Sequence, residues 1–307
     1  MGKVAFLFAG QGAQHPGMGK ELACAEAAAK ATFDALEAAM PGLSALCFEG
    51  TEEELTRTEN TQPSVFAVDL AAARALVAHG VIPDAVAGFS LGEVAALTFA
   101  GAFGDEDGFA LVRHRGDLMA ACCAAHPSGM RAVVKLDAPT VEALAEQAGA
   151  WPVNYNSPQQ TVVAGTPDAL ERLEALVKGA RGRALKMAVA GAFHSPLMAD
   201  ASTGLASWLK ACAPKPCAPP VWANTTGEPY PADPAAMAGL LAGQASHPVR
   251  WTRTLQGLRA QGFDTFVEVG PGSTLTKFVQ RTLEGVCALA CETPGQLSAV
   301  LETVGKE

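Results

Sequence analysis

The chain has 307 residues, of which 49% are hydrophobic and 17% are charged, and its formal net charge at pH 7 is −9. This composition excludes a disordered chain and predicts a substantial core, in one large α/β domain with an insertion or in two smaller domains. The negative charge counts against nucleic-acid binding, which needs a basic surface, but allows an acidic partner that docks on a local basic patch.

The N-terminal region predicts a first strand rather than a targeting signal. Its apolar run, residues 4–8, stops at Gly10-Gln11-Gly12 and is too short for a signal peptide. No apolar stretch of the sequence reaches the length of a membrane span. We therefore expect a cytoplasmic protein that does not bind a membrane.

The cysteines predict free thiols. They form no C-x-x-C pair and have no histidine at ligand spacing; the eight positions are 24, 47, 122, 123, 212, 217, 287 and 291. In a cytosolic chain of this length we therefore expect neither disulfides nor a metal site.

Strands and helices alternate in the first part of the chain. The hydrophobic pattern predicts strands at residues 4–8 and 85–89 and helices at residues 19–39, 63–78 and 91–100. Such alternation predicts a mostly parallel sheet.

From about residue 131 the order changes to strand, helix, strand, strand, helix, strand. The six predicted elements cover residues 131–136, 139–148, 153–156, 161–164, 167–177 and 183–189. This order is the ferredoxin-like arrangement. We therefore expect an inserted ferredoxin-like subdomain at residues 129–190, within a large catalytic domain formed by residues 1–128 and 191–307. A last strand is predicted at residues 265–269, before the turn at 270–272.

The segment Gly88-Phe89-Ser90-Leu91-Gly92 fits the G-x-S-x-G nucleophile elbow. A predicted strand precedes it and a predicted helix follows it, so Ser90 would lie on a tight turn at the helix N-terminus. The Leu91 N–H, free in the first helical turn, would point at a developing oxyanion. The expected fold class is therefore α/β, with an α/β-hydrolase-like parallel-sheet core and the inserted subdomain.

A nucleophilic serine needs a base, because its hydroxyl is a poor nucleophile at neutral pH. His194 lies where the chain leaves the inserted subdomain, and a domain junction favours a cleft. The residues alone do not choose between His194 and His247.

Two further features have both a purely structural and a functional interpretation. Gly10-Gln11-Gly12 lacks the third glycine of a dinucleotide loop, but the same turn would supply a backbone N–H near Ser90. Arg115 is either a solvated helix charge or a clamp for a carboxylate, which a guanidinium binds in a planar, bidentate way.

Taken together, these motifs resemble the malonyl-CoA:acyl-carrier-protein transacylases, which also occur as acyltransferase domains of fatty-acid and polyketide synthases. The matching segments run through nearly the whole chain and cover residues 8–14, 61–63, 88–93, 115–119, 156–160, 193–198, 244, 248–251 and 268–272.

The resemblance implies a role for each matching residue. Ser90 matches the nucleophile and His194 its base, while Gln244 matches the residue whose backbone carbonyl orients the imidazole. The N–H groups of Gln11 and Leu91 match the oxyanion hole. A separate position, Arg115, matches the arginine that pairs with the malonyl carboxylate.

The resemblance also implies malonyl transfer from malonyl-CoA, a CoA thioester, to the thiol of a holo acyl carrier protein through a malonyl-serine ester, with no bound cofactor. Phe193 matches the bulky residue seen where malonyl is preferred over α-methyl-malonyl. Phe89 departs from the commoner histidine before the serine, which leaves the fine acyl selectivity open.

Lys178, Arg181, Arg183 and Lys186 form a basic cluster that is either a docking patch for the acidic carrier protein or a solvated charge run. Two other functions stay open: a serine esterase or thioesterase with a triad acid between Ser90 and His194, and a non-catalytic module that binds carrier protein. We expect a monomer.

Overall fold

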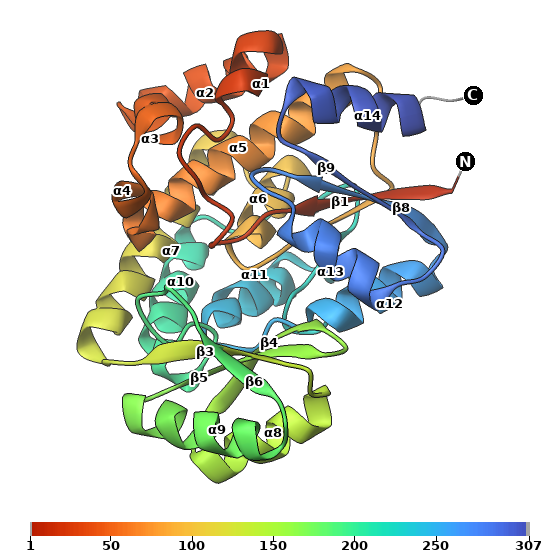
Figure 1. The fold of residues 1–307 in the computed structure, drawn as a ribbon. Coiled ribbons are helices and arrows are strands. Elements are labelled where there is room, and N and C mark those ends of the chain that lie inside the picture. The colour runs from red at the N-terminus through yellow and green to blue at the C-terminus, as the bar shows by residue number, and fades with distance from the viewer. Residues whose placement is uncertain (1, 305–307) are drawn as a thin grey trace.

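The computed structural model describes residues 2–304, and its centre is a five-stranded sheet (Figure 1). All neighbouring strands of this sheet are parallel. In order across the sheet they are β7 (Val221–Trp222), β2 (Ala85–Gly88), β1 (Lys3–Phe8), β8 (Phe263–Val269) and β9 (Cys287–Cys291). Because the strands run in one direction, the loops that follow β1, β2 and β8 gather at one edge of the sheet.

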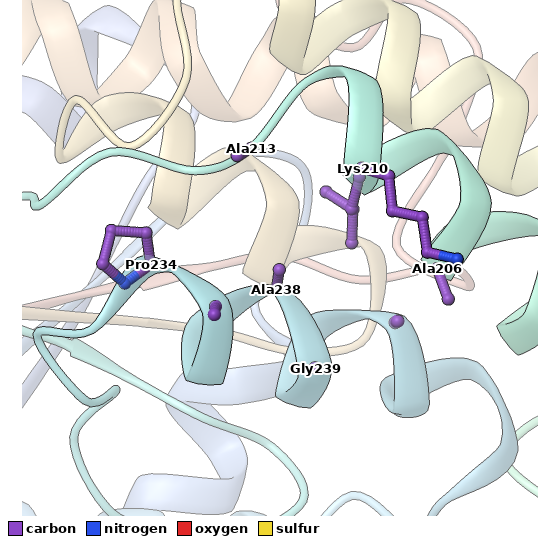
Figure 2. A pocket seen from close by; sticks show the side chains of 9 residues that line it. Ala206, Lys210, Ala213, Pro234, Ala238 and Gly239 are labelled. Atoms are coloured by element: carbon purple, nitrogen blue, oxygen red, sulfur yellow. The ribbon is translucent and has the colours of Figure 1, made fainter.

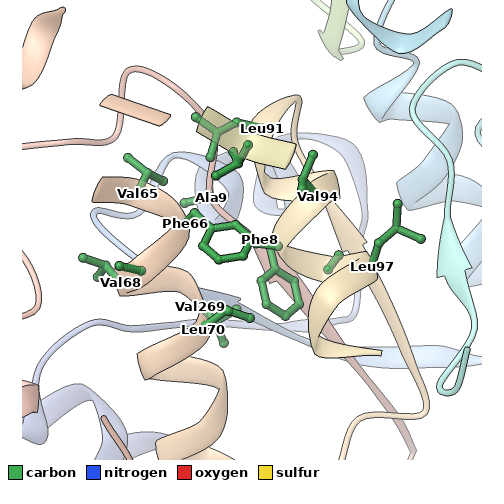
Figure 3. Packing of buried hydrophobic residues seen from close by; sticks show 14 of the residues in the cluster. Phe8, Ala9, Val65, Phe66, Val68, Leu70, Leu91, Val94, Leu97 and Val269 are labelled. Carbon is green, nitrogen blue, oxygen red and sulfur yellow. The ribbon is translucent and has the colours of Figure 1, made fainter. Parts of the chain in front are cut away.

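Both faces of the parallel sheet are buried. Phe6 and Phe8 of β1 pack into the cluster that includes α5 (Thr58–Ala78) and α6 (Leu91–Phe99). The alternate residues Ala5 and Leu7 pack into the opposite cluster, with α12 (Trp251–Ala260) and α13 (Thr274–Thr282). Figure 3 shows Phe8 in the first cluster, between the side chains of α5 and α6. Burial on two faces explains why these strands read as continuous apolar runs.

The other helices of the large domain lie around this core (Figure 1). They are α1 (Lys20–Ala25), α2 (Ala27–Ala39), α3 (Leu43–Glu49), α4 (Glu52–Thr56), α7 (Asp105–Ala125), α10 (Ala199–Ala211), α11 (Pro234–Gly243) and α14 (Pro294–Val304), with short 3-10 turns η1 (Pro196–Met198) and η2 (Gln244–Ser246).

A second sheet is antiparallel and lies apart from the first (Figure 1). In order across it, its strands are β4 (Trp151–Ser157), β5 (Gln160–Gly165), β3 (Gly129–Val134) and β6 (Arg183–Lys186). The helices α8 (Ala138–Ala148) and α9 (Pro167–Gly179) cover its outer face, whereas Met130 and Val162 on its inner face join the large core.

The sequence of these elements and the order of their strands are ferredoxin-like. The predicted fold class is therefore confirmed. The division of the chain at residues 129 and 190 stays a prediction.

Several predicted elements differ from those observed. The helix predicted at residues 19–39 is wrong as a single helix, because Glu26 is extended (φ −116°, ψ 118°) and separates α1 from α2. Helix α5 begins at Thr58 and contains Pro63, which was predicted to start it. A proline in the second turn removes only one backbone hydrogen bond, and the apolar surroundings of α5 hold the helix together.

Two strand predictions also need correction. The strand predicted at residues 183–189 ends at Lys186; the Met187 N–H still donates to the Met130 oxygen of β3, but the side chains of Met187 and Val189 line a pocket. Strand β9 was not predicted, because its five residues, CALAC, are small and mostly half-buried at the sheet edge. Within residues 2–304, no helix is both long enough and apolar enough to cross a membrane.

Candidate active site

Ser90 lies on the sharp turn between β2 and α6. Its backbone (φ 56°, ψ −109°) is outside the regions that residues other than glycine favour. A Cβ on Gly88 would lie 1.9 Å from the Gly92 carbonyl oxygen, and one on Gly92 would lie 2.3 Å from that of Phe8. The two flanking glycines are therefore needed for strand and helix to approach this closely.

Asn224, in the loop after β7, braces the elbow from the side. The Ser90 N–H donates to its Oδ1 at 2.7 Å, and its Nδ2 donates to the Gly88 carbonyl oxygen at 2.6 Å. Because all three residues are buried or nearly so, these bonds satisfy backbone groups that water does not reach. Asn224 was not predicted as a site residue, because its partners lie more than 130 residues away in the sequence.

His194 is the histidine that contacts the serine. Its Nε2 lies 2.8 Å from Ser90 Oγ, and its Nδ1 lies 2.9 Å from the backbone oxygen of Gln244. Because that carbonyl can only accept, Nδ1 carries the proton and Nε2 is free to accept the proton of Ser90. No carboxylate of the described residues contacts the imidazole. The other candidate, His247, is exposed and bonds to Gly243.

Arg115, on α7, is buried beside the serine rather than solvated. Its Nη2 donates to Ser90 Oγ at 3.0 Å and to Gln244 Oε1 at 2.7 Å. Its Nε also donates to Gln244 Oε1, and its Nη1 donates to Gln62 Oε1 at 2.8 Å. These four bonds leave one of the five guanidinium N–H groups without a protein partner. Gln62, within the 61–63 motif, had no role in the sequence analysis.

The electrostatics of the site follow from its burial. Burial and then the charge of Arg115 lower the pKa of His194 to about 4. The imidazole is therefore neutral near pH 7 and able to act as a base. Burial also lowers the pKa of Arg115 to about 10, with Glu93 opposing that shift, so the guanidinium stays charged.

Glu93 is a second buried ionisable residue, three residues after the serine. Burial raises the pKa of its carboxyl to about 7, although hydrogen bonds from Tyr230, Asn224 and Gln244 and the charge of Arg115 lower it. From the sequence, Glu93 was identified only as the last residue of the 88–93 motif.

A pocket of about 30 Å³ opens onto Ser90 and His194. Gln11 and Phe89 line it beside the serine, and its apolar wall consists of Met130, Met187, Val189 and Phe193. Gln11 lies in the turn closed by the Ala13 N–H and the Gly10 oxygen. The Leu91 N–H, at the first position of α6, has no partner within the helix. Arg115 does not line this pocket, but its Nη2 lies 3.0 Å from Ser90 Oγ, which does.

Phe89 faces two aromatic neighbours. Its ring lies edge-on to that of Trp251, with centroids 5.4 Å apart, and 6.3 Å from that of Phe278. Where a histidine would be a polar group next to the nucleophile, this chain therefore has an apolar contact with α12 and α13.

A neighbouring cavity of about 190 Å³ shares Gln11, Phe89, Asn154 and Met187 with the Ser90 pocket. The side-chain oxygens of Asn154 and Asn156, which are both buried, have no hydrogen-bond partner. The cavity therefore adjoins the Ser90 pocket and has two unpaired amide oxygens in an otherwise largely apolar wall.

Another groove, of about 450 Å³, lies between α10 and α11 (Figure 2). It is lined mostly by alanines and shares no residue with the Ser90 pocket; Lys210 is its one charged residue. In the described range, residues 2–304, no group of three or more His, Cys, Asp or Glu side chains is arranged to hold a metal ion.

Comparison with known proteins gives a consistent result. The family described as acyl transferase domain matches residues 5–301. A malonyl CoA-acyl carrier protein transacylase of Bacillus subtilis (strain 168) is 36% identical over 315 residues, which cover 100% of this chain and 99% of the relative.

Solved structures agree with the sequence comparison. The crystal structure of malonyl CoA-acyl carrier protein transacylase from Clostridium perfringens has a TM-score of 0.94 and 34% identity, and the match covers 99% of this chain and 97% of that one. A malonyl-transacylase solved in complex with a type II PKS acyl-carrier protein has a TM-score of 0.94 and 33% identity, and the match covers 98% of this chain and 99% of that one.

Proposed function

The chain belongs to the acyl transferase domain family, and we propose that it transfers the malonyl group of malonyl-CoA to the phosphopantetheine thiol of an acyl carrier protein. In this proposal the transfer serves fatty-acid or polyketide synthesis; a similar malonyl-transacylase has been solved in complex with a type II PKS acyl-carrier protein. The observation that carries the proposal is the contact of Ser90 Oγ with both His194 Nε2 and Arg115 Nη2.

The first half-reaction loads the enzyme. Ser90 Oγ attacks the thioester carbonyl while His194 Nε2 takes its proton. The N–H groups of Gln11 and Leu91 stabilise the tetrahedral oxyanion. The C–S bond then breaks, the leaving CoA sulfur takes the proton from His194, and a malonyl-serine ester remains.

The second half-reaction runs the same steps in reverse with a new thiol. His194 takes the proton of the phosphopantetheine thiol, the sulfur attacks the ester, and Ser90 recovers its proton as the C–O bond breaks. A thiol acceptor needs a path to Ser90, and the cavity beside Asn154 and Asn156, which adjoins the Ser90 pocket, would supply one. Their unpartnered amide oxygens suit the amide N–H groups of a pantetheine arm.

Acyl selectivity has two sources in this proposal. Arg115 binds the malonyl carboxylate, exchanging its bond to Ser90 Oγ and using its remaining N–H group. Phe193 and the methionines of the apolar wall limit the room beside the α-carbon, which disfavours an α-methyl substituent. Residues 129–190, the proposed inserted subdomain, contribute Met130, Asn154 and Met187 to these walls.

An esterase with a Ser-His-acid triad is less well supported, because the partner of His194 Nδ1 is the Gln244 carbonyl. A module that only binds carrier protein has no use for the buried Ser90–His194–Arg115 contacts. The test is the transfer itself: enzyme, malonyl-CoA and holo carrier protein should give malonyl carrier protein, while hydrolysis without carrier protein should be much slower. Equal thiol release with and without carrier protein would favour the hydrolase.

A further inference from the structure

We propose that Glu93 is a positioning residue: it fixes the orientation of the Gln244 side-chain amide and, through it, the guanidinium of Arg115. Glu93 thereby sets the preference for an acyl group that carries a carboxylate. The inference rests on the proposed function, in which Arg115 binds that carboxylate.

The two carboxylate oxygens of Glu93 have separate partners. Oε1 accepts from the Asn224 N–H at 3.0 Å and from the Tyr230 hydroxyl at 2.6 Å. Oε2 accepts from Gln244 Nε2 at 2.6 Å. The side chain is 1% exposed and makes no direct hydrogen bond to Arg115, His194 or the Ser90 side chain. Among the hydrogen-bond partners of Glu93, Gln244 is the one that also bonds to Arg115, so an effect of Glu93 on the geometry of Arg115 passes through Gln244.

The amide of Gln244 has acceptors on one side and donors on the other. Its Nε2 faces Glu93 Oε2 and the Ser90 carbonyl oxygen, 2.6 Å from each. Its Oε1 accepts from Arg115 Nε at 3.2 Å and Nη2 at 2.7 Å. An amide turned by 180° would place oxygen against two acceptors and nitrogen against a guanidinium that only donates. The orientation is therefore determined by its surroundings, and Glu93 is half of the acceptor side.

A glutamine at position 93 would not reproduce this pattern. If its oxygen faced Asn224 and Tyr230, its NH₂ would face the NH₂ of Gln244. If it were turned, its NH₂ would face the Asn224 N–H. Either arrangement sets two donors against each other, so only a side chain with two acceptor atoms fits. The Gln244 amide must then move away from position 93 or turn, and either change weakens or removes the two bonds that it makes to Arg115.

The consequence falls on Arg115 more than on His194. Arg115 loses its side-chain partner on Gln244, whereas His194 is held by the Gln244 backbone oxygen, which does not depend on the amide orientation. We therefore expect malonyl transfer to suffer and acetyl transfer, which has no carboxylate for Arg115, to be largely spared.

The experiment compares Glu93→Gln with the wild type in acylation by malonyl-CoA and by acetyl-CoA, each as kcat and KM. The ratio of kcat/KM for malonyl over acetyl should fall about tenfold or more, mainly through the malonyl KM. Tyr230→Phe is the matched control, because it removes one bond to Oε1 and leaves Oε2 on Gln244; its ratio should stay within about twofold of the wild type. Thermal unfolding verifies that each variant is folded.

A double variant separates positioning from a general structural role. In an Arg115→Ala background, Glu93→Gln should have no further effect on the ratio. Equal losses with malonyl and acetyl, or a further loss of the ratio in that background, would overturn the proposal. If Glu93→Gln does not fold, Glu93→Asp, which keeps two acceptor oxygens, takes its place in the experiment. A malonyl-to-acetyl ratio of kcat/KM in Glu93→Asp that is lower than that of Arg115→Ala would likewise contradict the proposal. A wild type without malonyl preference would instead refute the proposed function.

Discussion

The guanidinium of Arg115 donates a hydrogen bond to the hydroxyl oxygen of Ser90 at 3.0 Å, so the buried cation and the nucleophile are in direct contact. An acyl group on Ser90 Oγ is then within reach of Arg115 only if it is short. A carboxylate two carbon atoms from the ester oxygen suits this distance, which is the arrangement of a malonyl ester. The contact thus links the site of chemistry to the choice of substrate.

Replacing Arg115 by alanine should reduce the preference for malonyl over acetyl. A hydrogen bond to a charged group contributes about 1.5–3 kcal/mol, which corresponds to about 10- to 150-fold in the ratio of kcat/KM values. The measurement is acylation by the two thioesters in parallel. Arg115→Lys keeps the positive charge but not the planar, bidentate hydrogen-bond geometry of the guanidinium, and should recover only part of the malonyl-to-acetyl ratio. An unchanged malonyl-to-acetyl ratio in Arg115→Ala would show that another group binds the malonyl carboxylate.

The pH profile of acylation should show no histidine near its usual pKa. Burial lowers the pKa of His194 to about 4, so lowering the pH from 8 to 5 leaves Nε2 mostly unprotonated and able to accept the Ser90 proton. Acetyl-CoA is the suitable substrate, because its acyl group does not titrate. Its kcat/KM at pH 5 should lie within about twofold of that at pH 8. A histidine with the ordinary pKa of about 6.5 would instead give a fall of about 30-fold.

Removing the brace on the elbow should lower both stability and activity. Asn224→Ala leaves the Ser90 N–H and the Gly88 oxygen without partners, and a buried unpaired polar group costs about 1–3 kcal/mol. We expect the free energy of unfolding to fall by about 2–4 kcal/mol and the acylation rate to fall with it. Asn60→Ala, at a less buried amide, should change stability by about 0.5 kcal/mol or less. Chemical denaturation would measure both, and equal stabilities would contradict the brace.

Charge reversal in the basic cluster tests whether the carrier protein docks there. Arg181 and Arg183 are exposed, and β6, which contains Arg183, is an edge strand. Reversing both charges to glutamate should raise the KM for an acidic carrier protein about tenfold at low ionic strength, and should leave acylation by malonyl-CoA unchanged. Lys30→Glu with Arg57→Glu, on the distant helices α2 and α4–α5, is the matched control. If both half-reactions fell together, or neither fell, the docking patch would be wrong.

Much of this site was accessible from the sequence because its signals are local. The glycines around Ser90 mark a turn that only small residues allow, and the alternation of strands and helices predicts the parallel sheet. The partners that complete the site are different. Each of these partners is distant in sequence from the residue that it contacts: Gln62 contacts Arg115, Glu93 contacts Gln244, and Asn224 contacts Ser90, at separations of 53, 151 and 134 residues. No local sequence pattern predicts these contacts.

The choice between His194 and His247 shows the same limit. His194 follows the proposed subdomain boundary and His247 follows the short helix η2, and only the tertiary fold places one at the serine and the other in solvent. The helix break at Glu26 and the edge strand β9 also could not be predicted from the sequence, because tertiary contacts override weak local propensities there.

The measurement that tests the account most directly is the intact mass of the protein after brief exposure to malonyl-CoA, with Ser90→Ala alongside. The account predicts a malonyl adduct on the wild type, none on Ser90→Ala, and loss of the adduct when holo acyl carrier protein is added and becomes malonylated. An adduct that persists in Ser90→Ala, or one that hydrolyses at the same rate with and without carrier protein, would contradict it.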